Sequence, residues 1–202
     1  MLTTMTKLSE SKLIRDLKSI PSPIFYVFAA VVLCCSIFIC GFTVRGLLTG
    51  IFLVLLTACA SSDIKDGIVA DFVHILIVVL AFFNIMSSQN ITLETILEHL
   101  IGAVIVSVPM LIIALIIKGA FGGGDIKLMA SSGLYLGAKA IIAGFTLGMF
   151  SAGLYAIVLL ILHKVERKSK IRLVPFLVYG LVIISLYVEQ NINRLSIVAQ
   201  MC

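Results

Sequence analysis

Apolar residues occur along this chain in long uninterrupted runs rather than at alternating positions. Most runs approach the length of about 20 residues that a helix needs to cross about 30 Å of hydrocarbon. Because helices and closed barrels alone satisfy every backbone amide in lipid, continuous runs favour helices. The sequence therefore predicts an all-α, polytopic transmembrane helix bundle of about seven spans. The runs are Ile24–Phe42, Gly46–Ser62, Ile68–Met86, Ile96–Ile117, Ile126–Leu136, Ala140–Leu162 and Leu173–Val188.

The stretch from Asp125 to Leu162 is too long for a single crossing. As one helix it would measure about 57 Å, at about 1.5 Å per residue. We therefore expect the chain to turn near residues 137–139, which leaves a short span before the turn.

Small residues recur at four-residue spacing in this part of the chain. The pairs Gly133/Gly137 and Gly144/Gly148 are such stripes, and they predict close helix packing inside the bundle. Two histidines, His74 and His99, also lie within apolar runs. For both we expect a hydrogen-bonded packing role rather than proton relay.

The composition supports a bilayer environment. The chain is 61% apolar and 12% charged, with a mean hydropathy of +1.21, whereas ordinary globular domains are about 25% charged. Its 15 Lys and Arg outnumber its 10 Asp and Glu, but the basic residues lie in the connections between runs. Nucleic-acid binding is therefore not expected.

The basic residues divide unequally between the two sides of the predicted bundle. One side collects 12 of the 15, with the largest group in the run 164–172, and the other side has Arg45, Lys139 and Arg194. Because Lys and Arg concentrate in cytoplasmic connections, we expect a multi-pass protein with a cytoplasmic N-terminus.

The cysteines give no sign of a metal centre. The chain has neither a C-x-x-C pair nor Cys and His at zinc spacing. We therefore expect no metal, no disulfide framework and no cofactor. The five cysteines are Cys34, Cys35, Cys40, Cys59 and Cys202.

Two aspartates stand tightly against the ends of predicted spans. Asp63 follows the second run and Asp125 precedes the fifth, and between them lie one helix leading away and one leading back. The chain should thus return to the membrane surface from which it left, so that both carboxylates lie at the same depth in the bilayer. Ionisable groups at the edge of hydrocarbon are costly and are by default functional.

A pair of close carboxyls matches the chemistry of aspartic proteolysis. Two such groups cannot both ionise cheaply, so the pair holds one proton near neutral pH. The ionised group then takes a proton from water while the protonated one hydrogen-bonds the scissile carbonyl oxygen. This mechanism requires neither a metal nor a covalent intermediate.

The segments around the two aspartates resemble a known family. Gly122–Asp125 fits the G-x-G-D motif of intramembrane aspartyl proteases, and the continuation to Ala130 looks like the G-x-G-D-x-K-L motif of type IV prepilin and preflagellin peptidases. The family's first motif, an Asp followed after five residues by Ile-Pro-Asn or Ile-Pro-Asp, is similar to Asp63–Asp71, with Ala70 in place of proline.

The resemblance implies a role for each motif residue. Asp63 and Asp125 would be the catalytic pair. The glycines offer bare backbone that a peptide can approach closely, and the two lysines could hold the substrate backbone or balance charge. The substrate-binding candidates are Gly122, Gly123, Gly124, Lys127 and Lys65.

The resemblance also implies a substrate and a location. Members remove the leader of type IV pilin-like precursors at the cytoplasmic face of the prokaryotic cell membrane, serving pilus or secretion systems. The expected partners are thus prepilin-like precursors and the lipid bilayer. Many members carry a zinc-bearing insertion with N-methyltransferase activity, and the short connections here predict a form that lacks that domain.

The same comparison divides the chain into four parts. We expect 1–23 to be a cytoplasmic or interfacial segment and 24–45 an additional N-terminal transmembrane helix. Residues 46–190 would form the protease core, and 191–202 a C-terminal tail.

Other interpretations stay open from the sequence alone. Asp125 could be only a helix N-cap, and Asp63 a solvated loop acid. The pair could instead line the permeation path of an ion-coupled transporter, which would place both acids near the bilayer midplane. Ala70 leaves room for a catalytically inactive assembly subunit of the same fold.

Overall fold

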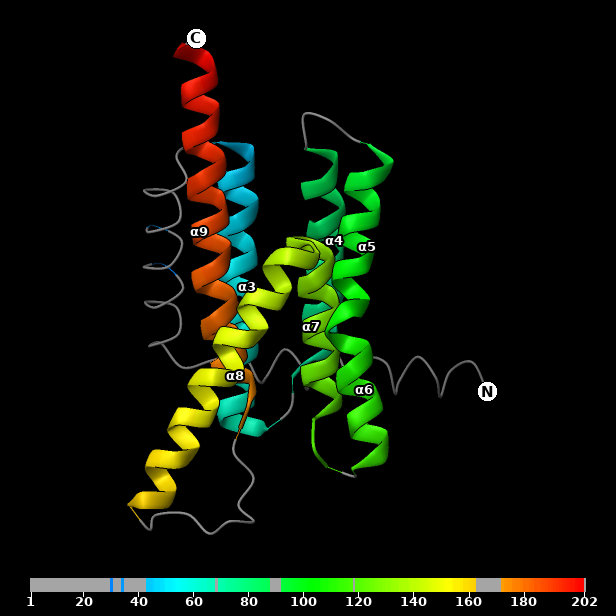
Figure 1. The fold of residues 1–202 in the computed structure, drawn as a ribbon, viewed down its shortest axis with the longest axis vertical. Coiled ribbons are helices and arrows are strands. Elements are labelled where there is room, and N and C mark those ends of the chain that lie inside the picture. Colours follow the sequence, from blue (N-terminus) through cyan, green and yellow to red (C-terminus); the bar gives the residue numbers. More distant parts are fainter. Residues whose placement is uncertain are drawn as a thin grey trace, which may run out of the picture.

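The computed structural model describes residues 30, 34, 43–67, 69–87, 92–117, 119–162 and 172–201. Every regular element within those ranges is a helix (Figure 1). The segment predicted for 1–23 and nearly all of the span predicted for 24–42 lie outside them. The helices are α3 (Val44–Asp66), α4 (Asp71–Met86), α5 (Leu93–Ile105), α6 (Ser107–Ile116), α7 (Gly123–Leu136), α8 (Ala138–Ile161) and α9 (Val174–Met201).

The six predicted spans that fall on described residues all correspond to helices, so the polytopic helical bundle is confirmed. Four stretches are long and apolar enough to cross a membrane: Val44–Ile64, Leu93–Ile116, Ala138–Ile161 and Val174–Asn191. The chain is thus a multi-pass membrane protein. Helix α9 is longer than expected, since it continues to Met201 through most of the predicted tail.

One predicted span is divided into two helices. Residues 96–117 form parts of α5 and α6, which are separated at Val106. Pro109 follows in the first turn of α6, and proline has no N–H to give the carbonyl four residues earlier. The interruption was not predicted, because the apolar run is continuous across Val106.

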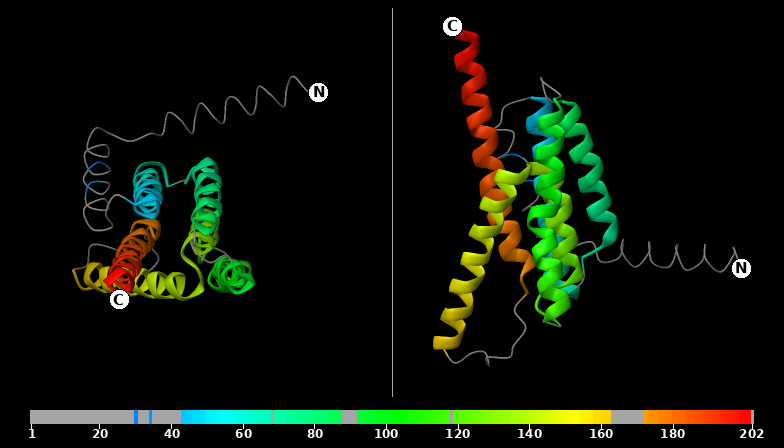
Figure 2. Two further views of the ribbon diagram at one scale, coloured as in Figure 1. Left: turned by 90° about the horizontal axis from the view of Figure 1, so that it is seen from above. Right: turned by 45° about the vertical axis from the view of Figure 1, so that its right-hand side comes forward.

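The helices form two groups joined by α8. Seen from above, α3 and α9 lie together on one side, α4, α5 and α7 lie on the other, and α8 crosses from one group to the other (Figure 2). The predicted turn at 137–139 is confirmed, since α7 ends at Leu136 and α8 begins at Ala138.

Glycines allow the closest helix contacts, as the four-residue spacing predicted. A Cβ atom at Gly133 of α7 would overlap the backbone of Gly102 in α5. A Cβ at Gly148 of α8 would lie 2.9 Å from the Cα atom of Leu177 in α9. These close approaches hold α8 against α9 and α5 against α7.

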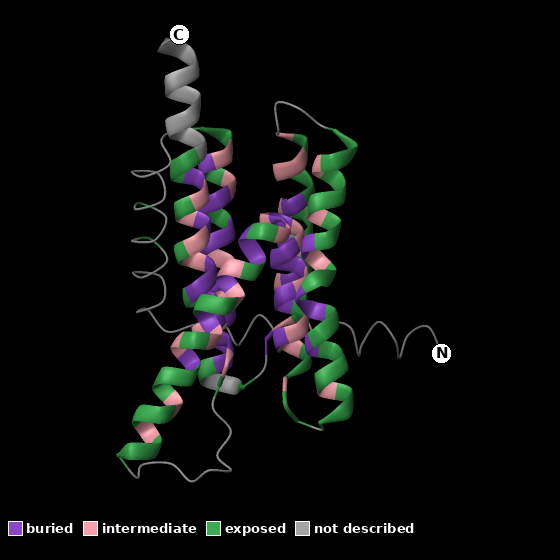
Figure 3. Cartoon of the chain, viewed as in Figure 1, coloured by how far each residue is buried: buried purple, intermediate pink, exposed green. Residues whose placement is uncertain are grey.

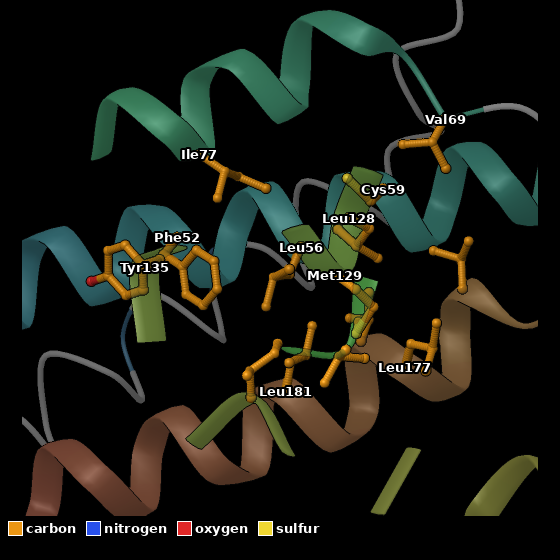
Figure 4. Packing of buried hydrophobic residues seen from close by; sticks show 14 of the residues in the cluster. Phe52, Leu56, Cys59, Val69, Ile77, Leu128, Met129, Tyr135, Leu177 and Leu181 are labelled. Atoms are coloured by element: carbon orange, nitrogen blue, oxygen red, sulfur yellow. The ribbon is translucent and has the colours of Figure 1, made fainter. Parts of the chain in front are cut away.

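The apolar core lies between the two groups of helices (Figure 4). Phe52 of α3 stacks on Tyr135 of α7 with ring centroids 4.1 Å apart, and Leu56, Leu128 and Leu181 are fully buried nearby. The outward faces carry exposed large apolar side chains instead (Figure 3). Such faces suit lipid rather than water.

Candidate active site

Asp63 lies in the last turn of α3 and is 8% exposed. The helix ends because Gly67 takes a left-handed conformation, with φ 66°, and its N–H donates to the Asp63 carbonyl oxygen at 3.0 Å. The Arg172 guanidinium donates to the same oxygen. The Asp63 carboxylate atom Oδ2 is buried and has no hydrogen-bond partner among the described residues.

Asp125 lies in the first turn of α7 and is also 8% exposed. The Gly122 N–H donates to its Oδ2 atom at 2.9 Å. Negative charge is favoured at a helix N-terminus, where backbone N–H groups are unpaired and the helix dipole is positive. The Gly122 N–H and the helix N-terminus thus favour a negative charge on Asp125, whereas burial opposes it.

The two aspartates line one cavity of about 440 Å³, which we call the carboxylate cavity. The cavity lies where α3 ends and where α4, α7 and α9 begin (Figure 1). Its other lining residues are Gly67, Val69, Ala70, Asp71, Gly122, Gly123, Gly124, Lys127 and Val174.

One simpler interpretation of the aspartates is wrong, and the other is confirmed in part. Asp63 is buried at a helix end and is not a solvated loop acid. Asp125 is the third residue of α7, and the N-cap position belongs to Gly122. Asp125 does support the start of the helix, by accepting the N–H of that capping residue.

The three glycines before Asp125 differ in what surrounds them. A Cβ atom at Gly122 would lie 3.1 Å from Asp125 Oδ2, whereas one at Gly123 would meet nothing within 4 Å. A Cβ at Gly124 would be in ordinary contact with Val69, at 3.5 Å. Gly123 is therefore the one whose backbone is open to an approaching peptide.

The predicted substrate-binding lysines have different environments. The Lys127 ammonium lies 2.6 Å from the Asp71 carboxylate, and both side chains are more than half exposed. This ion pair joins the second turn of α7 to the first turn of α4, 56 residues earlier in the chain. Lys65 lies in the last turn of α3, and its side chain is outside the described part of the structure.

The part of the chain that contains this site matches a known protein family. The model of the type IV leader peptidase family matches residues 50–157, which include both aspartates and both motifs. The chain belongs to the type IV leader peptidase family.

A curated relative shares 26% identity over 160 residues. It is the prepilin leader peptidase/N-methyltransferase of Bacillus subtilis (strain 168), and the match covers 76% of this chain and 64% of that relative. The chain thus spans less than two thirds of the relative's length. No solved structure shows a significant match to the chain.

Arg172 is a site residue that the sequence analysis did not single out. It was counted only among the basic residues that set the topology, yet it contacts the backbone of Asp63 from a position 109 residues away. A charge near a span end gives no signal of such a contact, because only the packing of α9 against α3 creates it.

The two histidines of this leader peptidase family member differ in their hydrogen bonding. His99 confirms the expected packing role, since its Nδ1 donates to the Leu134 carbonyl oxygen at 2.8 Å. His74 is buried in α4, but neither ring nitrogen has a hydrogen-bond partner among the described residues. For His74 only the packing part of the prediction is confirmed.

Ala70 stands where the family usually has proline, and its backbone conformation is one that proline can adopt. It is the N-cap of α4 with φ −66°, and the proline ring imposes φ near −65°. We expect Ala70→Pro to fold normally and to raise the free energy of unfolding by about 0.4–1 kcal/mol, because proline restricts the unfolded chain. Thermal unfolding in detergent measures this, and a clear decrease would contradict it.

Proposed function

We propose that this chain is a membrane-embedded aspartic endopeptidase that removes the leader peptide of type IV pilin-like precursors, with Asp63 and Asp125 as its catalytic pair. The observation that carries the proposal is that two aspartates from distant motifs, both buried, line one cavity at a span end. Their position at the ends of α3 and α7 argues against a transporter, whose acids belong near the midplane.

The proposed reaction consumes one water molecule. Asp125, at a helix N-terminus, is the ionised partner and accepts a proton as water attacks the scissile carbonyl carbon. Asp63 donates its proton to the carbonyl oxygen, which produces a tetrahedral gem-diol. Asp63 then takes one hydroxyl proton from the gem-diol while Asp125 gives its proton to the leaving nitrogen, and the carbon–nitrogen bond breaks. The products are a leader carboxylic acid, which ionises in water, and a mature N-terminal amine.

The surroundings of the two carboxylates fit this division of roles. Asp125 Oδ2 accepts a hydrogen bond from Gly122 N–H, and such bonds favour the charged form. Asp63 lies at a helix C-terminus, where the dipole disfavours negative charge, whereas the Arg172 guanidinium on its backbone carbonyl favours it. We assign the shared proton to Asp63 on two grounds: the dipole, and the lack of a donor to its Oδ2 among the described residues.

The cavity gives the substrate a defined approach. Gly123 exposes backbone beside Asp125, so an extended leader segment can lie along it without a side-chain clash. We place this end of the bundle at the cytoplasmic face, because most of the Lys and Arg residues lie in the connections on that side.

Purified full-length chain in lipid vesicles tests the function directly. A synthetic pilin-like precursor, with a glycine before its apolar segment, should be cut once, and mass spectrometry of both fragments identifies the bond. An uncut precursor, with a leader peptidase of known activity cutting the same peptide in parallel, would contradict the proposal.

Lys127 is expected to contribute to substrate binding beyond its ion pair with Asp71. The pair is exposed, so losing it should lower the free energy of unfolding by no more than about 1 kcal/mol. We expect Lys127→Met to raise KM by about tenfold with kcat little changed, which is the sign of lost uniform binding. Asp71→Asn, which keeps the ammonium, should raise KM by less than about threefold. Equal effects of the two variants would show that the pair is purely structural.

A further inference from the structure

A second polar cavity lies at the opposite end of the bundle from the two aspartates. We call it the far chamber. It measures about 150 Å³ and is lined by residues of α3, α4, α5, α7 and α9. Thr49 in its wall and Asp63 in the carboxylate cavity are 14 residues apart on α3, or about 21 Å. Phe52 and Leu56, both fully buried, lie on α3 between them.

The far chamber exists because α7 is short. Its 14 residues rise about 21 Å, which is less than the thickness of the hydrocarbon. The turn at Gly137 therefore lies below the far ends of α4 and α5 (Figure 1). The space beyond Tyr135 and Leu136 is left for polar side chains of the neighbouring helices.

The far chamber contains a buried carboxylate without a full set of partners. Glu189 of α9 is 7% exposed and lines the chamber. Arg45 and Thr49 line the same chamber, and the Glu189 Oε1 atom has no hydrogen-bond partner among the described residues. An unsatisfied buried charged group is costly, so a bound donor would be strongly favoured.

Three further lining residues use their donors on backbone carbonyls. Ser185 donates to Val182, Asn84 donates through Nδ2 to Tyr135, and His99 donates through Nδ1 to Leu134. What these side chains keep for the chamber are a hydroxyl lone pair, an amide oxygen with one further N–H, and the second ring nitrogen. With the Glu189 carboxylate, acceptors outnumber donors among these four residues, and the Arg45 guanidinium lines the same chamber.

We propose that the far chamber binds a small ligand through its primary ammonium group, with Glu189 as the anchor. An ammonium carries three N–H donors and a positive charge, which match a carboxylate and neighbouring neutral acceptors. The chamber holds the volume of about five water molecules, so the ligand has only a few heavy atoms. A hard metal ion would prefer oxygen ligands throughout, whereas one acceptor here is an imidazole nitrogen.

Two kinds of ligand could supply the primary ammonium group, and they can be distinguished. A simple alkylamine would use only the acceptors, whereas a free amino acid would also place its carboxylate near Arg45, which lines the same chamber. Titration calorimetry of the full-length chain in detergent, at constant ionic strength, compares ethylammonium and glycine. Tetramethylammonium, which has no N–H, and sodium are the controls.

We expect saturable binding of ethylammonium, glycine or both, and none of tetramethylammonium or sodium. Glu189→Gln should weaken binding by at least about tenfold, and Ser185→Ala by a smaller factor. If Glu189→Gln does not fold, weaker ammonium binding by the folded Ser185→Ala variant is the test of the site. Absence of saturable binding, equal binding of tetramethylammonium, or binding unchanged in the folded variants would overturn the proposal.

One variant separates this inference from the proposed peptidase function. Asp125→Asn should keep the affinity of the far chamber, because Asp125 lines only the other cavity. A loss of ammonium binding in that variant, with the protein still folded, would contradict an independent site.

Discussion

Replacing Asp125 with Asn is expected to lower the rate of leader cleavage by about 10³-fold or more, and Asp63→Asn should do the same. Both side chains are buried and line one cavity, so each amide keeps the shape but removes the group that moves protons. Single-turnover cleavage of a synthetic precursor, normalised to folded protein, measures the effect.

The two substitutions should not be additive. The paired carboxyls act as one unit, so the double variant should be no slower than either single one within about threefold. The matched control is Glu189→Gln, which changes a similarly buried acid at the other end of the bundle and should leave cleavage at the wild-type rate. Near-normal cleavage by either aspartate variant would disprove the assignment.

The second large effect is expected at Gly122. A methyl group there would lie 3.1 Å from Asp125 Oδ2 and 3.7 Å from its carboxyl carbon. The carboxylate must give way by a few tenths of an ångström, which strains its 2.9 Å bond to the Gly122 N–H. Because a displacement of about 1 Å in a reacting group can cost about 10²-fold, this smaller shift should lower kcat for Gly122→Ala by about 10-fold.

Gly123→Ala is the matched comparison for this prediction. Its methyl group would meet nothing in the chain within 4 Å but would project beside the carboxylate cavity. We therefore expect a raised KM with kcat nearly unchanged, because only an approaching substrate would contact it. If Gly122→Ala kept the wild-type kcat, or if Gly123→Ala left KM unchanged, the glycines would serve only to form a turn and would have no role in catalysis or substrate binding.

The arrangement of the two aspartates could be predicted from the sequence because it depends on topology alone. Between Asp63 and Asp125, one helix crosses the membrane and the next crosses back, so the chain returns to the same membrane surface whatever the tilt of the two helices. The turn at Gly137 followed from length in the same way. Small residues at four-residue spacing predicted close helix packing, and Gly133 and Gly148 do lie against neighbouring backbone, but the spacing did not indicate which helices would be the partners.

Other features depend on tertiary packing and left no local signal. The pairing of Lys127 with Asp71 joins residues 56 positions apart, and the contact of Arg172 with the end of α3 joins residues 109 apart. The far chamber arises because α7 stops short and several helices then turn polar side chains to the same space. In the sequence, Glu189 is a single acid after an apolar run.

The central claim is that a water molecule activated by Asp63 and Asp125 attacks the scissile peptide bond directly. A single turnover in water enriched in oxygen-18, with hydroxylamine present and the leader fragment analysed by mass spectrometry, tests it most directly. We predict a leader that ends in a carboxylate with one solvent oxygen and no hydroxamate, at a rate that Asp125→Asn abolishes. A leader hydroxamate or a leader covalently attached to the protein would reveal an acyl-enzyme and contradict the account.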